Sequence, residues 1–199
     1  MTMKILALSP HPDDVELGAG GFLLNALHKG AELDVVYCFR EKLTQVKQNS
    51  EQYGYHAMWL TNTTINTVRP SPTSNNVKLL DNILYNKAYT HFVIPHSGES
   101  HQDHKTVNSL AQASARRFRG MILQYEVISY TNNNKSFKPN LFFGIDNFID
   151  NKLNWANAYE DVTLDMIEGT RALNRVRGLN TDSKYAEAFE ILRWSDLLI

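Results

Sequence analysis

The sequence contains a single cysteine, Cys38, so the chain cannot form an internal disulfide. Cys38 lies in the apolar run 33–39, where a thiol is more often packed in a core than reactive. Chains without structural disulfides are typical of reducing compartments. We therefore expect a cytoplasmic protein with a buried, inert cysteine.

The chain also lacks an excess of charge of one sign and lacks any long apolar segment. Its 20 Lys and Arg nearly balance its 21 Asp and Glu, and its basic run at 116–119 falls at an expected helix end. This balance argues against a nucleic-acid partner. No segment is long enough to span a membrane, and His11 interrupts the first apolar run too early for a signal peptide.

What the sequence does contain is a regular alternation of apolar strand-like runs and helical segments. The runs predict strands over 3–8, 33–39, 57–60, 91–95, 122–127, 141–145 and 186–192. Helices are expected over 16–29, 41–53, 77–85, 106–117, 147–159 and 164–177. Gly30, Gly54 and Gly178 directly follow the first, second and last of these segments and are expected to end them. We predict one α/β domain, 1–199, with a doubly wound, mostly parallel sheet whose first five strands have the order 3-2-1-4-5.

A cluster of polar side chains follows the first strand directly. His11, Asp13 and Asp14 lie within four residues, and Glu16 comes next. A helix N-cap explains one aspartate, but not two together with a histidine. Buried carboxylates need a compensating cation, and carboxylate with imidazole is a suitable ligand set for a divalent metal. We interpret the cluster as half of a metal site and assign Glu16 to the first helical turn, where its charge meets the helix dipole.

Three glycines follow in the expected first helix, at positions 18, 20 and 21. Glycine destabilises a helix interior, so these positions predict close packing of the helix against the sheet. Their spacing is not G-x-G-x-x-G and they follow the acidic cluster, which argues against a dinucleotide-binding loop.

A second cluster, 96–104, follows the fourth strand and contains His101, Asp103 and His104. Strands 1 and 4 flank the point where the strand order reverses, so the loops that leave them line one crevice and the two clusters face each other. Two histidines and a carboxylate describe a catalytic zinc site or a non-haem iron(II) site. We favour His11, Asp14 and His104 as ligands, because this choice leaves Asp13 and His101 free on either side for proton transfer.

Both clusters resemble the signature motifs of a known family. The segments 11–21 (HPDDVELGAGG) and 101–104 (HQDH) are similar to those of the PIG-L/LmbE-like deacetylases, and weaker likeness continues at 125–127, 139–140, 177–178 and 185–190. The resemblance implies a Rossmann-like three-layer α/β/α fold. It also implies a zinc-dependent hydrolase that removes an N-acetyl group from an N-acetylated amino sugar or its conjugate (a glycoside, glycolipid or nucleotide sugar).

The resemblance also implies a role for each site residue. Zinc is bound by His11, Asp14 and His104, and Asp13 is the general base that assists attack by a metal-bound water. His101 stabilises the oxyanion and assists the leaving amine, and Asp103 orients a histidine. Because His101 is flanked by acids, we expect its pKa near or somewhat above the ordinary value.

The sequence departs from the family after the second strand. Where a Gly-Glu and an Arg-x-x-Glu are usual, this chain has Arg40-Glu41-Lys42 and then 45–48 (QVKQ), so we expect an unusual small-molecule sugar substrate. The polar segment 61–76, which contains Arg69, is a candidate substrate loop.

Several alternatives remain open at this point. An iron(II)-dependent oxygenase could use the same three ligands, and a non-catalytic carbohydrate-binding relative could keep them. The presence of Asp13 and His101 argues against the non-catalytic relative, because binding alone needs neither. Glu187 and Arg177 are candidates for the rim of the site, and His96 lies near it. A homo-oligomer is compatible with the sequence, which does not determine the oligomeric state.

Overall fold

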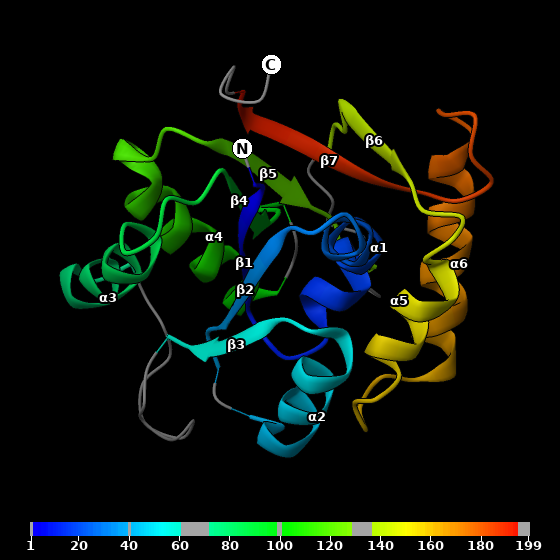
Figure 1. Ribbon diagram of the computed structural model, residues 1–199, viewed down its shortest axis with the longest axis horizontal. Coiled ribbons are helices and arrows are strands. Elements are labelled where there is room, and N and C mark those ends of the chain that lie inside the picture. The colour runs from blue at the N-terminus through cyan, green and yellow to red at the C-terminus, as the bar shows by residue number, and fades with distance from the viewer. Residues whose placement is uncertain (1, 40, 61–71, 99–100, 129–136, 195–199) are drawn as a thin grey trace.

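A seven-stranded sheet runs through the centre of the molecule (Figure 1). The computed structural model describes all residues except 1, 40, 61–71, 99–100, 129–136 and 195–199. The strands are β1 (Lys4–Ser9), β2 (Glu32–Tyr37), β3 (His56–Trp59), β4 (His91–Pro95), β5 (Met121–Tyr125), β6 (Leu141–Gly144) and β7 (Ala186–Arg193). Their order in the sheet is β3-β2-β1-β4-β5-β7-β6, which confirms the order predicted for the first five.

Strands β1 to β5 pair in parallel, and β7 pairs antiparallel with both β5 and β6. The strand order reverses between β1 and β4, and Ile5 of β1 lies opposite His91 of β4. The carboxyl ends of β1 and β4 therefore lie next to each other, where a doubly wound sheet places its ligand crevice.

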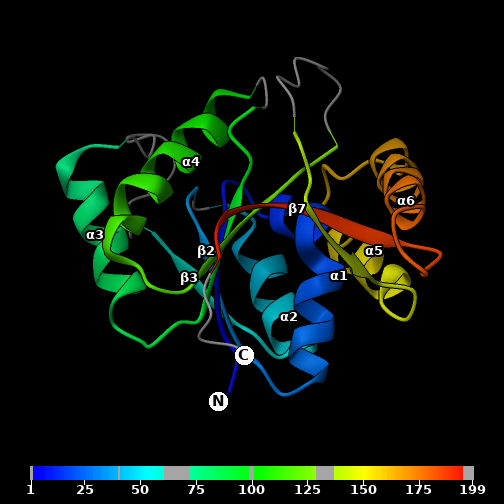
Figure 2. The same cartoon turned by 90° about the horizontal axis from the view of Figure 1, so that it is seen from above.

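Helices cover both faces of this sheet and form the three predicted layers (Figure 2). They are α1 (Asp14–His28), α2 (Leu43–Tyr53), α3 (Ser74–Leu84), α4 (Gln102–Ser114), α5 (Ile149–Ala156) and α6 (Leu164–Gly178), and a 3₁₀ turn, η1 (Ala115–Arg117), follows α4. One apolar core joins α1, α2 and α5 to the sheet, and a second joins α3 and α4 to its other face. Adjacent residues of β1 divide between the cores, Ile5 into the first and Leu6 into the second.

The three glycines of α1 confirm close packing. A Cβ on Gly18 would lie 2.2 Å from the Tyr125 ring, and one on Gly21 would lie 2.8 Å from the side chain of Ile145. The three glycines that were predicted to end helices differ in backbone conformation. Gly30 and Gly54 adopt positive φ just after α1 and α2, as predicted, whereas Gly178 is the last residue of α6 and lies against the carbonyl of Lys184. Gly178 is therefore required for close packing and not for a left-handed cap.

Helix α1 begins two residues before the predicted start, and α3 and α4 begin still earlier relative to theirs. Helix α4 starts at Gln102 and not at 106, with His101 as its N-cap, so His104 projects from the first helical turn. Helix α3 starts at Ser74 because the Thr73 hydroxyl accepts a hydrogen bond from the backbone N–H of Asn76. The segment 61–71, with Arg69, lies outside the described residues. None of the helices in the described part of the chain is long and apolar enough to cross a membrane.

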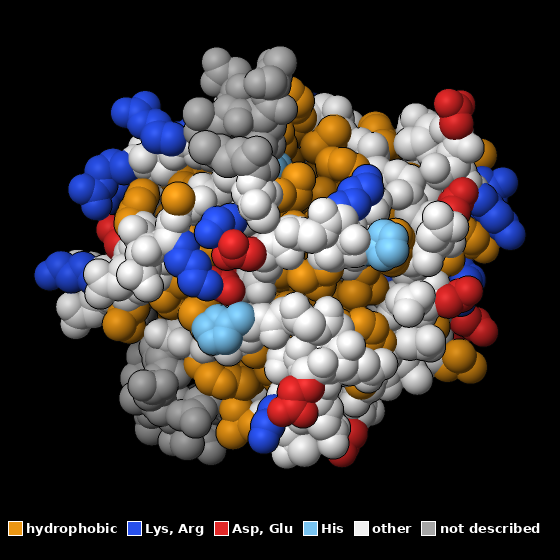
Figure 3. All heavy atoms as spheres, viewed as in Figure 1, with side chains coloured by type: hydrophobic (Ala, Val, Ile, Leu, Met, Phe, Trp, Pro, Cys, Tyr) orange, Lys and Arg blue, Asp and Glu red, His pale blue; other side chains and the backbone are white. Residues whose placement is uncertain are grey.

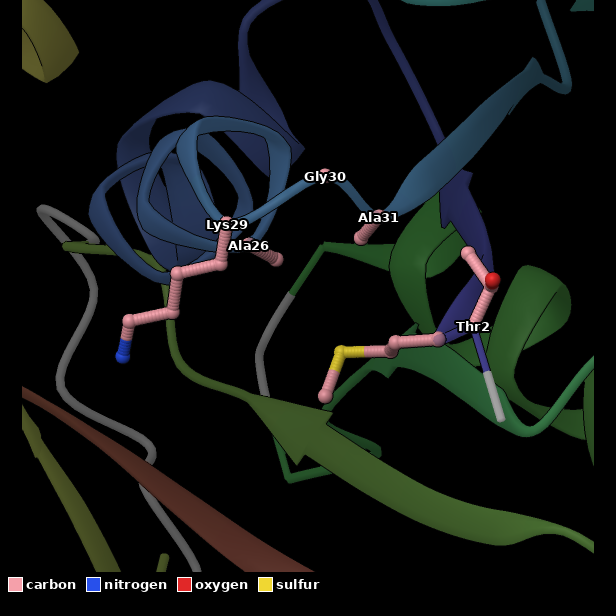
Figure 4. A pocket seen from close by; sticks show the side chains of 6 residues that line it. Thr2, Ala26, Lys29, Gly30 and Ala31 are labelled. Carbon is pink, nitrogen blue, oxygen red and sulfur yellow. The ribbon is translucent and has the colours of Figure 1, made fainter.

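The surface seen in Figure 3 carries acidic and basic side chains interspersed among polar and apolar ones. At the amino end of β1 a hollow of about 490 Å³ opens between the start of the chain and the end of α1 (Figure 4). It is lined by Thr2, Met3, Ala26, Lys29, Gly30 and Ala31. Lys29 is the titratable residue among these described lining residues, which include no carboxylate and no imidazole. They therefore offer no metal ligands at this end of β1, which is the end far from His11.

Candidate metal centre and active site

The turn between β1 and α1 has a defined geometry that presents His11 and Asp14. The Ser9 hydroxyl donates to the carbonyl of His11 at 2.6 Å and accepts from the backbone N–H of Val15 at 3.1 Å. The backbone N–H of His11 in turn donates to Asp14 Oδ2 at 2.8 Å. Asp13, the N-cap of α1, has φ 135°, a conformation that is strained for a residue with a Cβ.

His11, Asp14 and His104 converge from the two motifs. One ligand atom of each lies within 4.8 Å of the others. Asp14 is the shared partner, since its Oδ2 lies 3.2 Å from His11 Nδ1 and its Oδ1 lies 3.2 Å from His104 Nε2. Two imidazoles and one buried carboxylate fit a divalent metal with a coordination position left for water. The structure thus brings the predicted ligands together.

The two adjacent aspartates have opposite electrostatic environments. Burial raises the pKa of Asp13 to about 8, with help from the charge of Asp14 and against the opposing effect of Lys42. Burial acts in the same direction on Asp14, but His104 and His11 outweigh it and hold the pKa of Asp14 well below its ordinary value. The pKa values of the two carboxyl groups are therefore shifted in opposite directions, although the residues are adjacent in the sequence.

Asp103 lies behind the histidines, at the first turn of α4. Its Oδ2 is 3.4 Å from His11 Nε2 and 3.9 Å from His101 Nδ1. A carboxylate in this place orients the His11 ring from the side opposite to Asp14. The orienting role that the resemblance implies for Asp103 stays a prediction.

His101 is the most open of the site histidines, with a side chain 54% exposed. Its ring contacts the rings of both His11 and His104, at centroid distances of 5.3 and 4.9 Å. Burial, followed by the charges of His104 and His11, lowers the pKa of His101, so the expectation of an ordinary or raised value is wrong. The flanking acids raise this pKa less than burial and the two histidines lower it.

Sequence reasoning missed a cationic partner of Asp13. Lys42 Nζ donates to Asp13 Oδ2 at 2.8 Å, and the Lys42 side chain is only 17% exposed. Lys42 stands where the sequence departs from the family pattern, yet 29 positions separate it from Asp13 and no spacing rule connects the two residues.

Glu16 has a more specific role than the predicted contact with the helix dipole. It is fully buried, and its Oε1 accepts hydrogen bonds from the hydroxyls of Tyr37 at 2.7 Å and Tyr159 at 2.8 Å. Its Oε2 accepts from the backbone N–H of Asp13 at 3.1 Å. Burial raises the pKa of Glu16 to about 7, although both tyrosine hydroxyls oppose the shift.

Glu187 does not lie on the rim, and that prediction is wrong. It is fully buried, 2.6 Å from Lys152 Nζ, and accepts from the backbone N–H groups of Gly21 and Phe22. The pair joins β7, α5 and α1 inside the protein. Arg177 is partly exposed and forms a bidentate ion pair with Glu126, and His96 is buried 3.4 Å from Glu190.

Comparison with known proteins decides the family. A model of the PIG-L family, described as GlcNAc-PI de-N-acetylase, matches residues 6–115, which is more than half of the chain. This protein belongs to the PIG-L family. The assignment confirms the predicted resemblance and the predicted class of enzyme, a deacetylase. A comparison with curated proteins found no match.

Solved structures with the PIG-L-like fold of this chain span almost its whole length. The conserved protein TT1542 from Thermus thermophilus has a TM-score of 0.80 at 22% identity, covering 100% of this chain and 96% of its own. The N,N'-diacetylchitobiose deacetylase from Pyrococcus horikoshii has a TM-score of 0.77 at 20% identity, covering 98% and 87%. GalB, the 4-carboxy-2-hydroxymuconate hydratase from Pseudomonas putida, has a TM-score of 0.77 at 13% identity, covering 100% of both chains. At these identities the likeness establishes the fold.

Proposed function

We propose that this PIG-L protein is a zinc-dependent hydrolase that removes the N-acetyl group from an N-acetylated amino sugar or its conjugate. The observation that carries the proposal is the convergence of His11, Asp14 and His104 beside Asp13. Zinc suits two imidazoles and a carboxylate, and it supplies a water of lowered pKa and a Lewis acid for the acyl carbonyl.

The protein's own residues supply the proton transfers. Asp13, which adjoins Asp14 but lies outside the ligand cluster, accepts a proton from the attacking water. His101 lies across the ligand cluster, where its imidazole can hydrogen-bond the developing oxyanion and then give a proton to the leaving amine. Asp103 orients the rings of His11 and His101. The products are acetate and a free amine.

The substrate class follows from the family and from the character of the site. Family membership and the chitobiose deacetylase fold favour an acetamido sugar as the acceptor. Phe39 stacks on the His11 ring at a centroid distance of 4.7 Å and adds an apolar wall to the cluster. Because the residues after β2 differ from the usual family pattern, we propose an acetamido sugar or conjugate that is unusual for the family.

The decisive test is amine release from a panel of N-acetylglucosamine, its glycosides and UDP-N-acetylglucosamine. Purified protein is assayed as isolated, after treatment with a chelator, and after addition of zinc. We expect one or more conjugates to release equal amounts of amine and acetate, with loss of activity on chelation and recovery with zinc. Full activity in metal-free protein would contradict the proposal, and uptake of oxygen in step with product would instead indicate the iron(II) oxygenase.

A further inference from the structure

The Lys42 ammonium group is held at three points beside the proposed base. It donates to Asp13 Oδ2 at 2.8 Å and to the carbonyl of Pro12 at 2.9 Å, and it lies 2.5 Å from Asp161 Oδ1. An ammonium group has three hydrogens, and these three acceptors match that number. Lys42 therefore has no hydrogen left for a substrate, and any effect on the reaction passes through Asp13.

The backbone of Lys42 has a left-handed conformation that is unusual for a lysine. Lys42 precedes α2 and has φ 52° and ψ 38°, the left-handed conformation that is unfavourable for a residue with a Cβ. Glycine or asparagine would satisfy this backbone at lower cost. A lysine here gains the contacts of its ammonium group, which offset the strain.

A second contact fixes Asp13 from the interior. Glu16 Oε2 accepts from the backbone N–H of Asp13, while Glu16 Oε1 accepts from Tyr159. The Tyr159 ring also lies under the Lys42 ammonium group, at 5.3 Å from its centroid. Asp13 is thus held at its backbone by Glu16 and at its carboxylate by Lys42, and Tyr159 touches both of these residues.

We propose that Lys42 is a positioning residue that fixes the Asp13 carboxylate for proton transfer. It binds one carboxylate oxygen, Oδ2, and so sets the direction in which the carboxyl group faces the ligand cluster. The inference rests on the proposed function for its catalytic consequence, but the contact itself is independent of that function. Lys42 contacts none of His11, Asp14 and His104 in the described ion pairs, so its loss leaves metal binding intact.

The test compares Lys42→Met, Lys42→Arg and the control Lys47→Met. Methionine is unbranched like lysine and one atom shorter, and it carries no charge. Lys47 is an exposed lysine on the helix that follows Lys42. We expect Lys42→Met to lower kcat by about 10–100-fold, the usual cost of a small misplacement, with KM within about twofold of wild type. Lys42→Arg should recover at least part of this loss, and Lys47→Met should behave as wild type.

Zinc content of each variant separates positioning from general damage. Lys42→Met should bind the same amount of zinc as wild type, measured by elemental analysis of the dialysed protein. A kcat for Lys42→Met within about twofold of wild type would overturn the proposal. Loss of zinc in Lys42→Met would also overturn it, because the effect would then arise at the metal ligands.

A thermal unfolding cycle keeps this inference separate from the proposed function. Lys42→Met is introduced alone and together with Asp13→Asn, and the melting temperatures of all four proteins are compared. We expect Lys42→Met to lower the melting temperature clearly in wild type and much less in the Asp13→Asn background, because the carboxylate that Lys42 binds is then already absent. Equal losses in both backgrounds would show that Lys42 does not hold Asp13, whether or not the protein deacetylates any sugar.

Discussion

The chemistry of the site depends on two neighbouring residues of the same type with different surroundings. Asp14 contacts two imidazoles and has a depressed pKa, whereas Asp13 faces a single ammonium group and has a raised one. Asp13 is the N-cap of α1, and Asp14 is the first residue of the helix. Their different partners explain the opposite shifts of their pKa values.

His101 offers a sharp prediction at the residue scale. Its open position and its lowered pKa are compatible with a group that hydrogen-bonds the reacting carbonyl and passes a proton to the amine. We expect His101→Ala to keep its zinc and to lower kcat by about 10²–10⁴-fold, the range for a lost acid or base. Steady-state kinetics on the best conjugate would check this. A normal rate would show that His101 takes no part in catalysis and serves only as the N-cap of α4.

Cys38 gives a prediction about pH. The thiol is buried, and burial raises its pKa well above the ordinary value. The unfolded chain releases this proton above about pH 8.5 while the folded chain keeps it, so the unfolded state binds fewer protons there. The free energy of unfolding should then fall by up to about 1.4 kcal/mol per pH unit above that point, relative to Cys38→Ala. Urea titrations between about pH 8 and pH 9.5, which bracket the ordinary thiol pKa, measure the difference, and parallel curves for both proteins would contradict it.

The sequence was sufficient to predict the residues that follow a strand directly. His11, Asp14 and His104 could be selected because each cluster starts where an apolar strand ends, and neighbouring strand ends meet. Lys42 could not be predicted as a partner of Asp13. Its contact depends on a left-handed backbone before α2, and a lysine at such a position carries no sequence signal.

At the scale of elements, helix α1 is fixed on several sides and carries Asp13 and Asp14 at its start. Gly18 allows the helix to approach the Tyr125 ring, and the buried pair of Lys152 and Glu187 holds its backbone from α5 and β7. Removal of one partner of such a pair leaves an uncompensated buried charge and typically costs about 3–5 kcal/mol. These contacts join α1, which carries the first motif at its start, to the sheet and to α5.

The elements themselves were predicted well where periodicity was strong. All seven strands occur close to the expected residues, because buried strands read as short apolar runs. The starts of α3 and α4 were missed, since their first turns are polar and their caps are a threonine and a histidine. Glu187 was placed on the rim because the sequence does not show that Lys152 of α5 lies opposite to it.

At the scale of the whole molecule, the fold alone leaves the reaction open. A chitobiose deacetylase and a hydratase both share the architecture of this chain over nearly its full length. Function on a shared fold is set by the side chains of the site, which in this chain follow β1 and β4. The proposed deacetylation therefore depends on Asp14 as a metal ligand and on Asp13 as a proton acceptor.

The most direct test is the zinc affinity of Asp13→Asn and Asp14→Asn, measured by calorimetric titration of the metal-free proteins. The same substitution at adjacent positions makes each variant the control for the other. Asp14→Asn should lose the high-affinity site, because the carboxylate shared by His11 and His104 is gone. Asp13→Asn should bind one zinc per chain with nearly the wild-type affinity and yet release no amine from substrate. Equal loss of zinc in both variants, or undiminished binding in Asp14→Asn, would contradict the account.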